Sequence, residues 1–318
     1  MKRFKNILFV NVKPDDKAAF ERAVTLAVRN QATLTVVEVL ETLPPEERML
    51  INSRHNVDLM EIAAQKSSKH LESLIAPLES EGLRVDSKVL LGTPFLEIIR
   101  EVLRKEHDLV IKAAEGKSQT NHMLFGSTAM HLMRKCPCPV WVIKPNRRER
   151  QARILAAVDP APSDSERQGL NTKIMELATS LAELEGSELH IVHCWRQPYE
   201  GRLKMFEKMF DELARDTVDK IISDTRNEHK MWLTAFLEEF ALENLNHKLH
   251  LLKGEPGLVI PRLAWNKRIE LIVMGTVCRT GIAGFFIGNT AEKVLSQVDC
   301  SVLTVKPDGF VTPVRLDE

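Results

Sequence analysis

Residues 271–281 read LIVMGTVCRTG, and the triplet GNT follows at residues 288–290. The first four residues are apolar, as in a buried strand, and a helical pattern begins after residue 288, so a strand-to-helix turn is predicted. Glycines and small polar residues let backbone N–H groups approach an anion at the start of such a helix. The stretch therefore indicates a phosphate-binding turn, although glycines at this spacing also serve ordinary tight turns.

The same pattern occurs twice in the chain. The segment CPVWVIKP at residues 138–145 matches CSVLTVKP at 300–307, at an offset of 162 residues (300 minus 138). The apolar run at residues 6–12 matches residues 153–159 at an offset of 147 (153 minus 6). Repetition at a constant offset indicates a tandem duplication, with 15 extra residues (162 minus 147) in the first half of the second copy.

Each copy alternates short apolar runs with segments of 3.6-residue periodicity. This alternation predicts a parallel sheet covered on both faces by helices. We therefore expect an α/β protein with two domains of five strands each, at residues 1–146 and 152–308, and a tail at 309–318. Residues 200–245 are rich in Met, Phe and charge and are expected to form a helical excursion that carries the insertion.

The composition excludes several classes of protein. Lys and Arg together number 44, as do Asp and Glu, so the net charge is zero and no direct nucleic-acid binding is expected. No run reaches the roughly 18 apolar residues of a membrane span, and the N-terminus does not read as a signal peptide. The five cysteines suit reduced thiols. A cytoplasmic protein without a membrane span is therefore predicted.

These repeated motifs resemble the universal stress protein family in its tandem form, over about residues 4–307. The family motif, GxxGx9G followed by a small polar residue, lies at the end of the fourth strand. In the second copy, Gly275 and Gly288 take the first and third glycine positions, and Asn289 and Thr290 follow. Cys278 stands at the second glycine position. The resemblance implies Rossmann-like domains of the adenine nucleotide alpha hydrolase type.

The first copy departs from the motif elsewhere. Ala113 stands at the first glycine position, while Gly116 and Gly126 take the second and third. The family also places an Asp after its first strand, near the base and ribose of the ligand. Asp159 matches this position in the second copy, whereas the first copy has Val12. We therefore expect an adenine-nucleotide site in the second copy and none that is complete in the first.

The expected ligand is ATP or a related adenine nucleotide, with Mg²⁺ if ATP is bound. The Asp159 carboxylate is expected to accept hydrogen bonds from ribose hydroxyls, and the turn at 288–290 to hold phosphate. Arg279 either contributes its positive charge to phosphate binding or is a solvated side chain. If the backbone at Cys278 must have a positive φ, the Cβ of this residue makes that conformation about 1–2 kcal/mol less favourable. The predicted site residues are Asp159, Gly275, Thr276, Cys278, Arg279, Gly288, Asn289 and Thr290.

The resemblance implies a cytoplasmic stress protein that supports survival of growth arrest and DNA-damaging stress, with a nucleotide altering a surface that unidentified protein partners recognise. The alternative is a non-catalytic scaffold or carrier whose degenerate sites hold another small or apolar ligand. No Walker loop, nucleophile elbow or HExxH zinc motif occurs, so weak ATPase activity is the most that is expected.

Family members with a single domain pair through the edge of the last strand. The resemblance thus implies that residues 140–144 and 302–306 pair within one chain as an intramolecular pseudo-dimer, and further dimerisation of the chain is left open. Two other groups are given structural roles. Cys136 and Cys138 are expected to be buried thiols, and His190 and His193 to point to opposite faces of a strand and share no metal.

Overall fold

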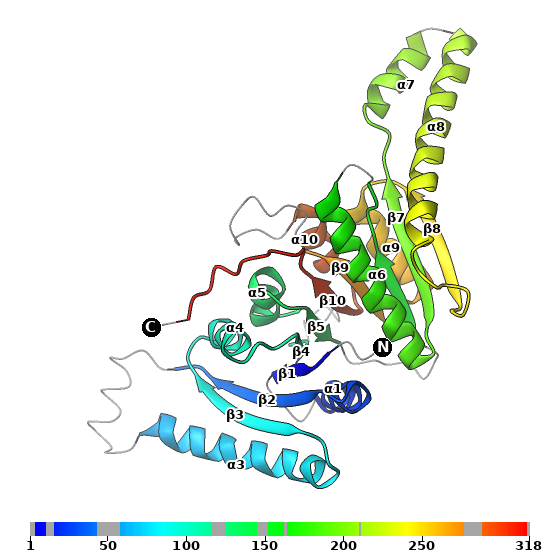
Figure 1. Cartoon of the computed structure of the whole chain (residues 1–318). Helices are drawn as coiled ribbons and strands as arrows, with labels where there is room; N and C mark the ends of the chain where they lie inside the picture. The colour runs from blue at the N-terminus through cyan, green and yellow to red at the C-terminus, as the bar shows by residue number, and fades with distance from the viewer. Residues whose placement is uncertain are drawn as a thin grey trace. The chain divides into compact units, whose positions relative to one another are not determined.

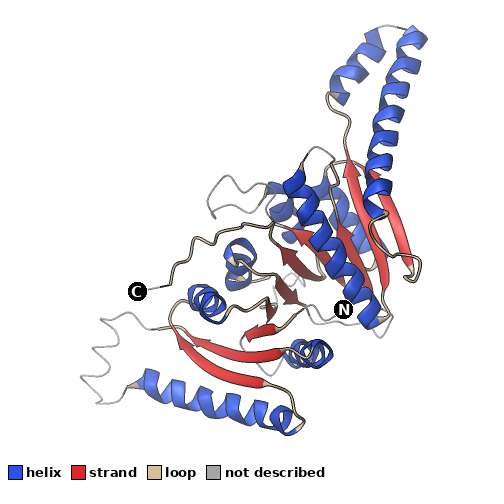
Figure 2. Ribbon diagram, viewed as in Figure 1, coloured by secondary structure: helices blue, strands red, loops and turns tan. Residues whose placement is uncertain are grey.

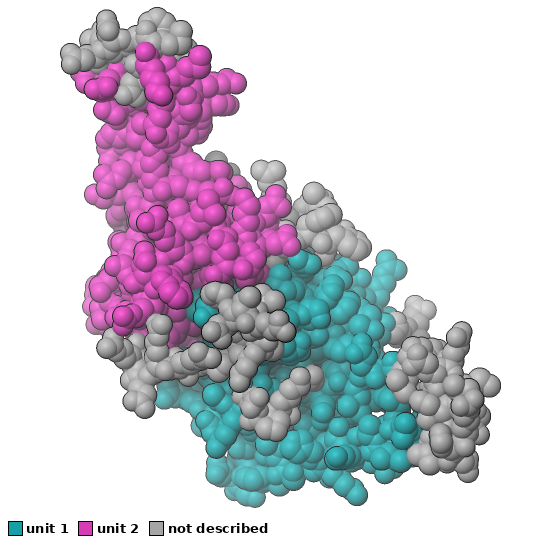
Figure 3. All heavy atoms as spheres, turned by 180° about the vertical axis from the view of Figure 1, so that it is seen from behind, with its two compact units in different colours: residues 1–148, 280–287, 299–318 teal, residues 149–279, 288–298 magenta. Residues whose placement is uncertain are grey.

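The computed structural model describes residues 4–10, 16–42, 58–115, 125–144, 152–161, 164–209, 211–276 and 288–316. The chain divides into two compact units (Figure 3). Unit 1 contains residues 1–148, 280–287 and 299–318, and unit 2 contains residues 149–279 and 288–298. The final strand of the second copy is therefore part of unit 1.

Unit 1 has six described strands in the order β3-β2-β1-β4-β5-β10. The first five are parallel to one another, and β10 is antiparallel to β5. Their bounds are β1 Asn6–Val10, β2 Thr33–Leu40, β3 Val85–Leu91, β4 Leu109–Ala113, β5 Val140–Ile143 and β10 Ser301–Val305.

Helices flank this sheet because each places an apolar stripe against the strands (Figure 2). They are α1 Lys17–Asn30, α3 Leu59–Ser80, α4 Pro94–Lys105 and α5 Ser127–Lys135. Pro94 opens α4, where its missing N–H costs no hydrogen bond. Ile98, Ile99 and Trp141 are almost fully buried in the core.

The pairing of β5 with β10 joins the last strands of the two copies. Val142 lies opposite Val302, and Trp141 lies opposite Leu303. The hydroxyl of Thr304 also donates to the Val140 carbonyl at 3.2 Å. The predicted pairing of these strands within one chain is thus confirmed, and it gives the β5 edge a backbone partner.

Unit 2 has four described strands, all parallel, in the order β8-β7-β6-β9. They are β6 Arg153–Ala157, β7 Glu188–Trp195, β8 His247–Lys253 and β9 Leu271–Gly275. The helices are α6 Ser165–Glu185, α7 Glu200–Met209, α8 Asp211–Leu237, α9 Pro256–Lys267 and α10 Asn289–Leu295. Two α/β repeats with a mostly parallel sheet, as predicted, are confirmed.

The helical excursion predicted in the second copy consists of α7 and α8. In Figure 1 the two helices lie side by side and extend beyond the end of β7. The lower part of α8 packs on the unit through Leu233, Phe236 and Leu237, which are all buried. Met205 of α7 is 62% exposed. No helix in the described residues is sufficiently long and apolar to cross a membrane.

Candidate functional site

The predicted site lies at the carboxyl ends of β6 and β9 in unit 2. These strands are adjacent and parallel, with Ala157 opposite Met274. Asp159 follows β6 and Gly275 ends β9, so both residues lie at the same edge of the sheet. This edge is where open parallel sheets bind their ligands.

Gly275 is close to the first part of α6. A Cβ added at this position would lie 2.6 Å from Cδ2 of Leu170, which is closer than Cβ atoms approach carbon in proteins. Leu170 itself is buried. The glycine therefore allows α6 to pack against the end of β9, which is a structural reason for the first glycine of the motif.

A backbone hydrogen bond joins the residue that follows β9 to the residue that precedes α10. The N–H of Gly288 donates to the carbonyl of Thr276 at 2.7 Å, and Thr276 is buried. Gly288 immediately precedes α10, and the exposed residues Asn289 and Thr290 form the first positions of that helix. The first N–H groups of a helix have no partner within it, so they can bind an anion.

Two of the predicted site residues cannot be placed. Cys278 and Arg279 lie in the segment 277–287, outside the described residues. The roles predicted for the Cys278 side chain and for the Arg279 charge therefore stay predictions.

Asp159 forms an ion pair that the sequence analysis did not anticipate. Its Oδ2 accepts a hydrogen bond from Nη1 of Arg167 at 3.1 Å, and Nε of Arg167 lies 3.0 Å from Oδ2 of Asp164. The Asp159 side chain is 60% exposed and the Arg167 side chain 29%. Arg167 thus holds two carboxylates, while an open face of Asp159 remains in contact with solvent.

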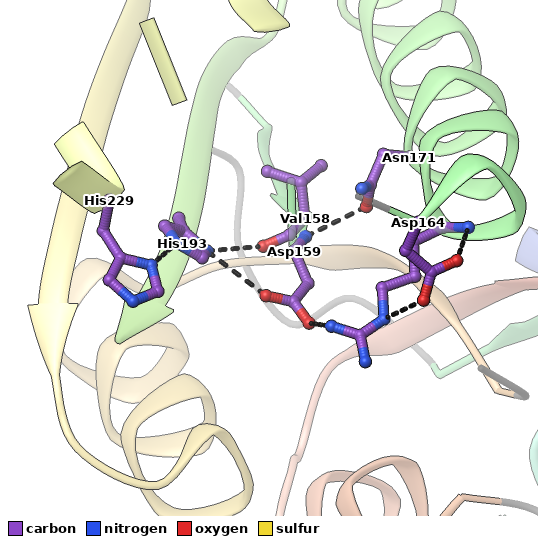
Figure 4. A network of polar contacts seen from close by, with 7 residues as sticks. Val158, Asp159, Asp164, Asn171, His193 and His229 are labelled. Atoms are coloured by element: carbon purple, nitrogen blue, oxygen red, sulfur yellow. Dashed lines mark hydrogen bonds and ion pairs between the residues drawn. The ribbon is translucent and has the colours of Figure 1, made fainter. Parts of the chain in front are cut away.

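The backbone at Asp159 is positioned by Asn171 of α6. The Asp159 N–H donates to Oδ1 of Asn171 at 2.9 Å, and Asn171 is buried (Figure 4). Asp164 starts the same helix and accepts from the Arg167 N–H at 3.1 Å as its N-cap. Helix α6 therefore sets the direction in which the Asp159 carboxylate leaves the strand.

A buried histidine lies on the other side of Asp159. Nδ1 of His193, on β7, is 3.3 Å from the Val158 carbonyl oxygen and 3.7 Å from Oδ1 of Asp159. Its Nε2 lies 2.8 Å from Nδ1 of His229 on α8 (Figure 4). His193 is completely buried, whereas His229 is half-buried.

The two histidines of β7 have separate partners. His190 contacts His250 of β8, with 2.9 Å between Nδ1 of His190 and Nε2 of His250. His193 contacts α8, as described above. Because residues three apart on a strand point to opposite faces, this separation agrees with the predicted strand geometry. A structural role was expected for His193, and its contact with Asp159 was not predicted.

Burial alters the acid–base properties of the site. It lowers the pKa of His193, a change that the nearby Asp159 carboxylate opposes and His229 reinforces. Burial likewise lowers the pKa of His229, and Asp159 opposes this change too. Burial raises the pKa of the neighbouring Cys194 thiol to about 12, with a further contribution from Asp159. Both imidazoles are consequently neutral at pH 7, and Cys194 is a thiol.

The groups that could hold an adenine nucleotide are the exposed face of Asp159 and the N–H groups at the start of α10. Magnesium would require phosphate oxygens as additional ligands, because the described residues contain no cluster of three or more His, Cys, Asp or Glu side chains suited to a metal. The described part of the site therefore offers hydrogen bonds to a sugar and a phosphate and contains no preformed metal cage.

The equivalent edge of unit 1 is arranged differently. Ala113 ends β4, and the Glu115 side chain lies directly over Gly126, where an added Cβ would be 2.6 Å from Oε2 of Glu115. Glu115 pairs with Nζ of the buried Lys112 at 2.7 Å. A carboxylate of the chain itself thus lies beside the start of α5. Val12 and Gly116 lie outside the described residues.

Sequence reasoning missed Arg167, His193 and His229 as neighbours of Asp159. One available signal was the position of His193 near the end of a strand beside the Asp159 strand. Another was Arg167 in the first turn of the next helix. His229 had no such signal, because its helix belongs to the insertion, where the two copies share no alignment.

Comparison with known proteins covers the whole chain. The model of the universal stress protein family matches residues 3–144 and again residues 152–306. Universal stress protein E of Salmonella typhi is 32% identical over 331 residues, covering 100% of this chain and 99% of that protein. Universal stress protein E of Escherichia coli strain K12 is 31% identical over 324 residues, with the same coverage.

Solved structures share the fold. A functionally unknown protein from Pseudomonas aeruginosa PAO1 has a TM-score of 0.69 at 24% identity, covering 96% of this chain and 94% of that one. A universal stress protein from Archaeoglobus fulgidus DSM 4304 has a TM-score of 0.63 at 17% identity, covering 95% and 98%. At these identities the likeness concerns the fold alone.

Proposed function

The chain belongs to the universal stress protein family, so its function lies in the response to stress, and we propose that it acts there as a nucleotide-responsive protein of the cytoplasm. In this proposal unit 2 binds ATP or a related adenine nucleotide, and binding changes a surface that protein partners recognise. Support of survival during growth arrest and DNA-damaging stress is part of the same proposal.

One observation carries the nucleotide part of the proposal. The exposed face of the Asp159 carboxylate and the start of α10 lie at the same edge of the unit 2 sheet. A carboxylate there can accept hydrogen bonds from ribose hydroxyls, and helix N–H groups can hold a phosphate. The ribose and the phosphate of a nucleotide would thus each have a complementary group at this edge of the sheet.

Arg167 is expected to affect the affinity. A ribose hydroxyl would share Asp159 with the guanidinium, which already occupies one carboxylate oxygen at 3.1 Å. The ion pair is partly exposed, and such pairs contribute only about 0–1 kcal/mol. Rearrangement of Arg167 toward a phosphate would therefore cost little, and its positive charge would favour a nucleotide over a nucleoside.

Unit 1 is assigned no nucleotide. Glu115 brings a negative charge beside the start of α5, where a phosphate would have to bind, and Lys112 is already paired with it. The Glu115 carboxylate and a phosphate bound beside it would repel each other. The proposed stoichiometry is accordingly one nucleotide per chain.

Calorimetric titration with Mg-ATP tests the proposal. We expect saturable binding near one per chain, lost in Asp159→Ala and retained in Asp86→Ala, which removes an exposed carboxylate from β3 of unit 1. Unchanged binding in Asp159→Ala would contradict the placement of the site. Absence of binding at millimolar Mg-ATP would contradict nucleotide binding itself.

Exposed apolar side chains on the excursion favour the second candidate, a scaffold. Met205 and Met231 are 62% and 65% exposed, and flexible methionines suit surfaces that adapt to different partners. A scaffold should retain its partners in the Asp159→Ala variant and in nucleotide-free buffer. Crosslinking to partners that is abolished by Asp159→Ala would favour the nucleotide-responsive proposal instead.

A further inference from the structure

A continuous row of polar contacts connects the candidate site with the helical excursion. It runs from the Asp159 carboxylate to the His193 imidazole, 3.7 Å away, and from there to His229, 2.8 Å away (Figure 4). Asp159 follows β6, His193 lies on β7, and His229 lies on α8. The row thus begins at a solvent-exposed group and ends on the helix that projects from the unit.

The acceptors around His193 determine where its proton lies. Nδ1 of His193 faces the Val158 carbonyl and the Asp159 carboxylate, which are both acceptors, so this nitrogen carries the hydrogen. In the neutral imidazole Nε2 is then an acceptor. It receives a hydrogen bond from Nδ1–H of His229, and Nε2 of His229 is left with a lone pair.

This tautomer determines which nitrogen of the pair binds the next proton. A proton added at Nε2 of His229 makes a cation that still donates through Nδ1, so the bond to His193 is retained. Asp159 stabilises that cation through the polarised His193 ring, in the way that a carboxylate stabilises an imidazolium. A second proton would have to go to Nε2 of His193, and two donors would then face each other.

His229 is also part of the attachment of α8. The centroid of its ring lies 6.2 Å from that of Trp195 on β7, and within α8 the ring packs edge-on against Trp232 at 4.7 Å. Two further polar contacts of the excursion are the hydrogen bond from the Thr225 hydroxyl to Gln197 and the 2.8 Å ion pair between Lys253 and Glu200. The histidine bond is the one attachment among these that titrates in the mildly acidic range.

Charged groups from β8, α8 and the end of β6 surround the pair. Asp159 faces His193 from the β6 side, and Asp159 and Glu228 raise the pKa of His229 against the lowering effect of burial. From β8, Lys253 lies over the Trp195 ring at 5.5 Å. The net effect lowers both pKa values below 6.5, so the pair takes up protons as the pH falls below that value.

We propose that the Asp159–His193–His229 row is a proton-linked coupling between the sheet-end site and helix α8. Anything that neutralises Asp159 or hydrogen-bonds to it reduces the affinity of His229 for a proton and changes how firmly α8 is held on β7. By reciprocity, protonation of His229 changes the affinity of the site. The coupling itself needs no ligand, and only its regulation by a nucleotide rests on the proposed function.

The first experiment follows the histidine rings of the full chain by NMR between pH 4.5 and 8. The His229 signal is identified by its absence in His229→Phe. We expect Asp159→Asn to lower the His229 midpoint by about half a pH unit, because the stabilising anion is gone. The matched control is Asp164→Asn, which removes the other carboxylate held by Arg167 and keeps a good N-cap.

Two outcomes decide this step. A shift in Asp159→Asn that is absent in Asp164→Asn supports the coupling. Equal midpoints in the wild type and Asp159→Asn overturn it, because the carboxylate would then have no influence on His229.

The second experiment measures hydrogen exchange of the α8 amides. His229→Phe keeps the aromatic packing against Trp232 and removes the hydrogen bond, so we expect faster exchange around residues 225–237 with little change in α6. Lowering the pH to 5 should also speed α8 exchange in the wild type after correction for the intrinsic exchange rate, although the bond to His193 is retained: burial lowers the pKa of His229, so a proton binds it more tightly when α8 opens. If neither change alters α8 exchange, the pair only packs and the proposal is wrong.

The third experiment adds Mg-ATP and separates this inference from the proposed function. If ATP binds as proposed, binding near pH 6 should release a fraction of a proton in the wild type and none in His229→Phe. Binding without this difference overturns regulation through the row. Failure of ATP to bind contradicts the proposed function alone, because the first two experiments still decide the coupling.

Discussion

Nδ1 of His190 and Nε2 of His250 lie 2.9 Å apart, and their rings stack with only 8° between the planes. His190 is on β7 and His250 is on β8. Burial lowers the pKa of both rings, and for His250 the value falls to about 4. Two neutral imidazoles thus join β7 to the neighbouring strand β8 by a bond that protonation of both would break.

The first prediction is a loss of stability in acid that depends on His250. The unfolded chain binds a proton at His250 near pH 6.5 and the folded chain only near pH 4, so stability is full above pH 6.5 and falls as the pH approaches 4. One such proton contributes a slope of at most about 1.4 kcal/mol per pH unit. His250→Gln keeps a polar partner and cannot titrate, so its unfolding free energy should fall less steeply.

Urea unfolding at pH 6.5, 5.5 and 4.5 measures this slope. His247→Gln, at the start of the same strand, is the matched control and should retain the wild-type slope. Identical slopes in wild type and His250→Gln would show that His250 does not control acid stability.

The second prediction concerns Lys306, which is buried in unit 1 and donates from Nζ to the Met133 carbonyl at 2.6 Å. Burial lowers its pKa to about 7. The unfolded chain therefore binds an extra proton between pH 7 and about 10.5, and stability should rise with pH across that range. Lys306→Met cannot titrate, so its unfolding free energy should rise less between pH 7 and 9.

Denaturant midpoints at pH 7 and 9 give this comparison directly. Lys66→Met, which changes an exposed lysine of α3, should behave as the wild type. A difference between the two pH values that is equal in wild type and Lys306→Met would contradict the prediction.

The third prediction concerns the pairing of β5 with β10. A chain that ends at residue 298 lacks β10 and leaves the N–H and C=O groups of the β5 edge without their antiparallel partner. Unpaired apolar edges promote association of chains. We expect this chain to form higher oligomers at concentrations where a chain ending at residue 308 keeps the wild-type mass, as measured by light scattering. Equal masses for the two shortened chains would argue against a protective role for β10.

The sequence predicted the fold well because buried strands need apolar runs and both copies repeat them in the same order. The pairing of residues 140–144 with 302–306 was expected from the resemblance to the family, and the antiparallel pairing of β5 with β10 confirms it. Asp159 and Gly275 lie at one edge of the sheet because Asp159 follows β6 and Gly275 ends the adjacent parallel strand β9.

The side-chain contacts of the site were less predictable. The bond between His193 and His229 joins a strand to a helix of the insertion, and no period or motif relates positions so far apart. The neighbours of Arg167 in the sequence predict a helix there, but its contact with Asp159 depends on the angle between α6 and β6. Such contacts follow from tertiary packing, which local patterns do not encode.

The last prediction tests the ion pair that distinguishes unit 1. Lys112 is 3% exposed and pairs with Glu115, which is 33% exposed, at 2.7 Å. Glu115→Ala leaves the buried ammonium, within the part of the chain that the structure describes, with the Ala113 carbonyl at 3.5 Å, and should lower the unfolding free energy by about 1–3 kcal/mol. The double variant Lys112→Met/Glu115→Ala also removes the Lys112 ammonium and should be more stable than Glu115→Ala alone. Thermal unfolding of the wild type, both single variants and the double variant measures the coupling, and additive effects of the two substitutions would show that the pair contributes nothing.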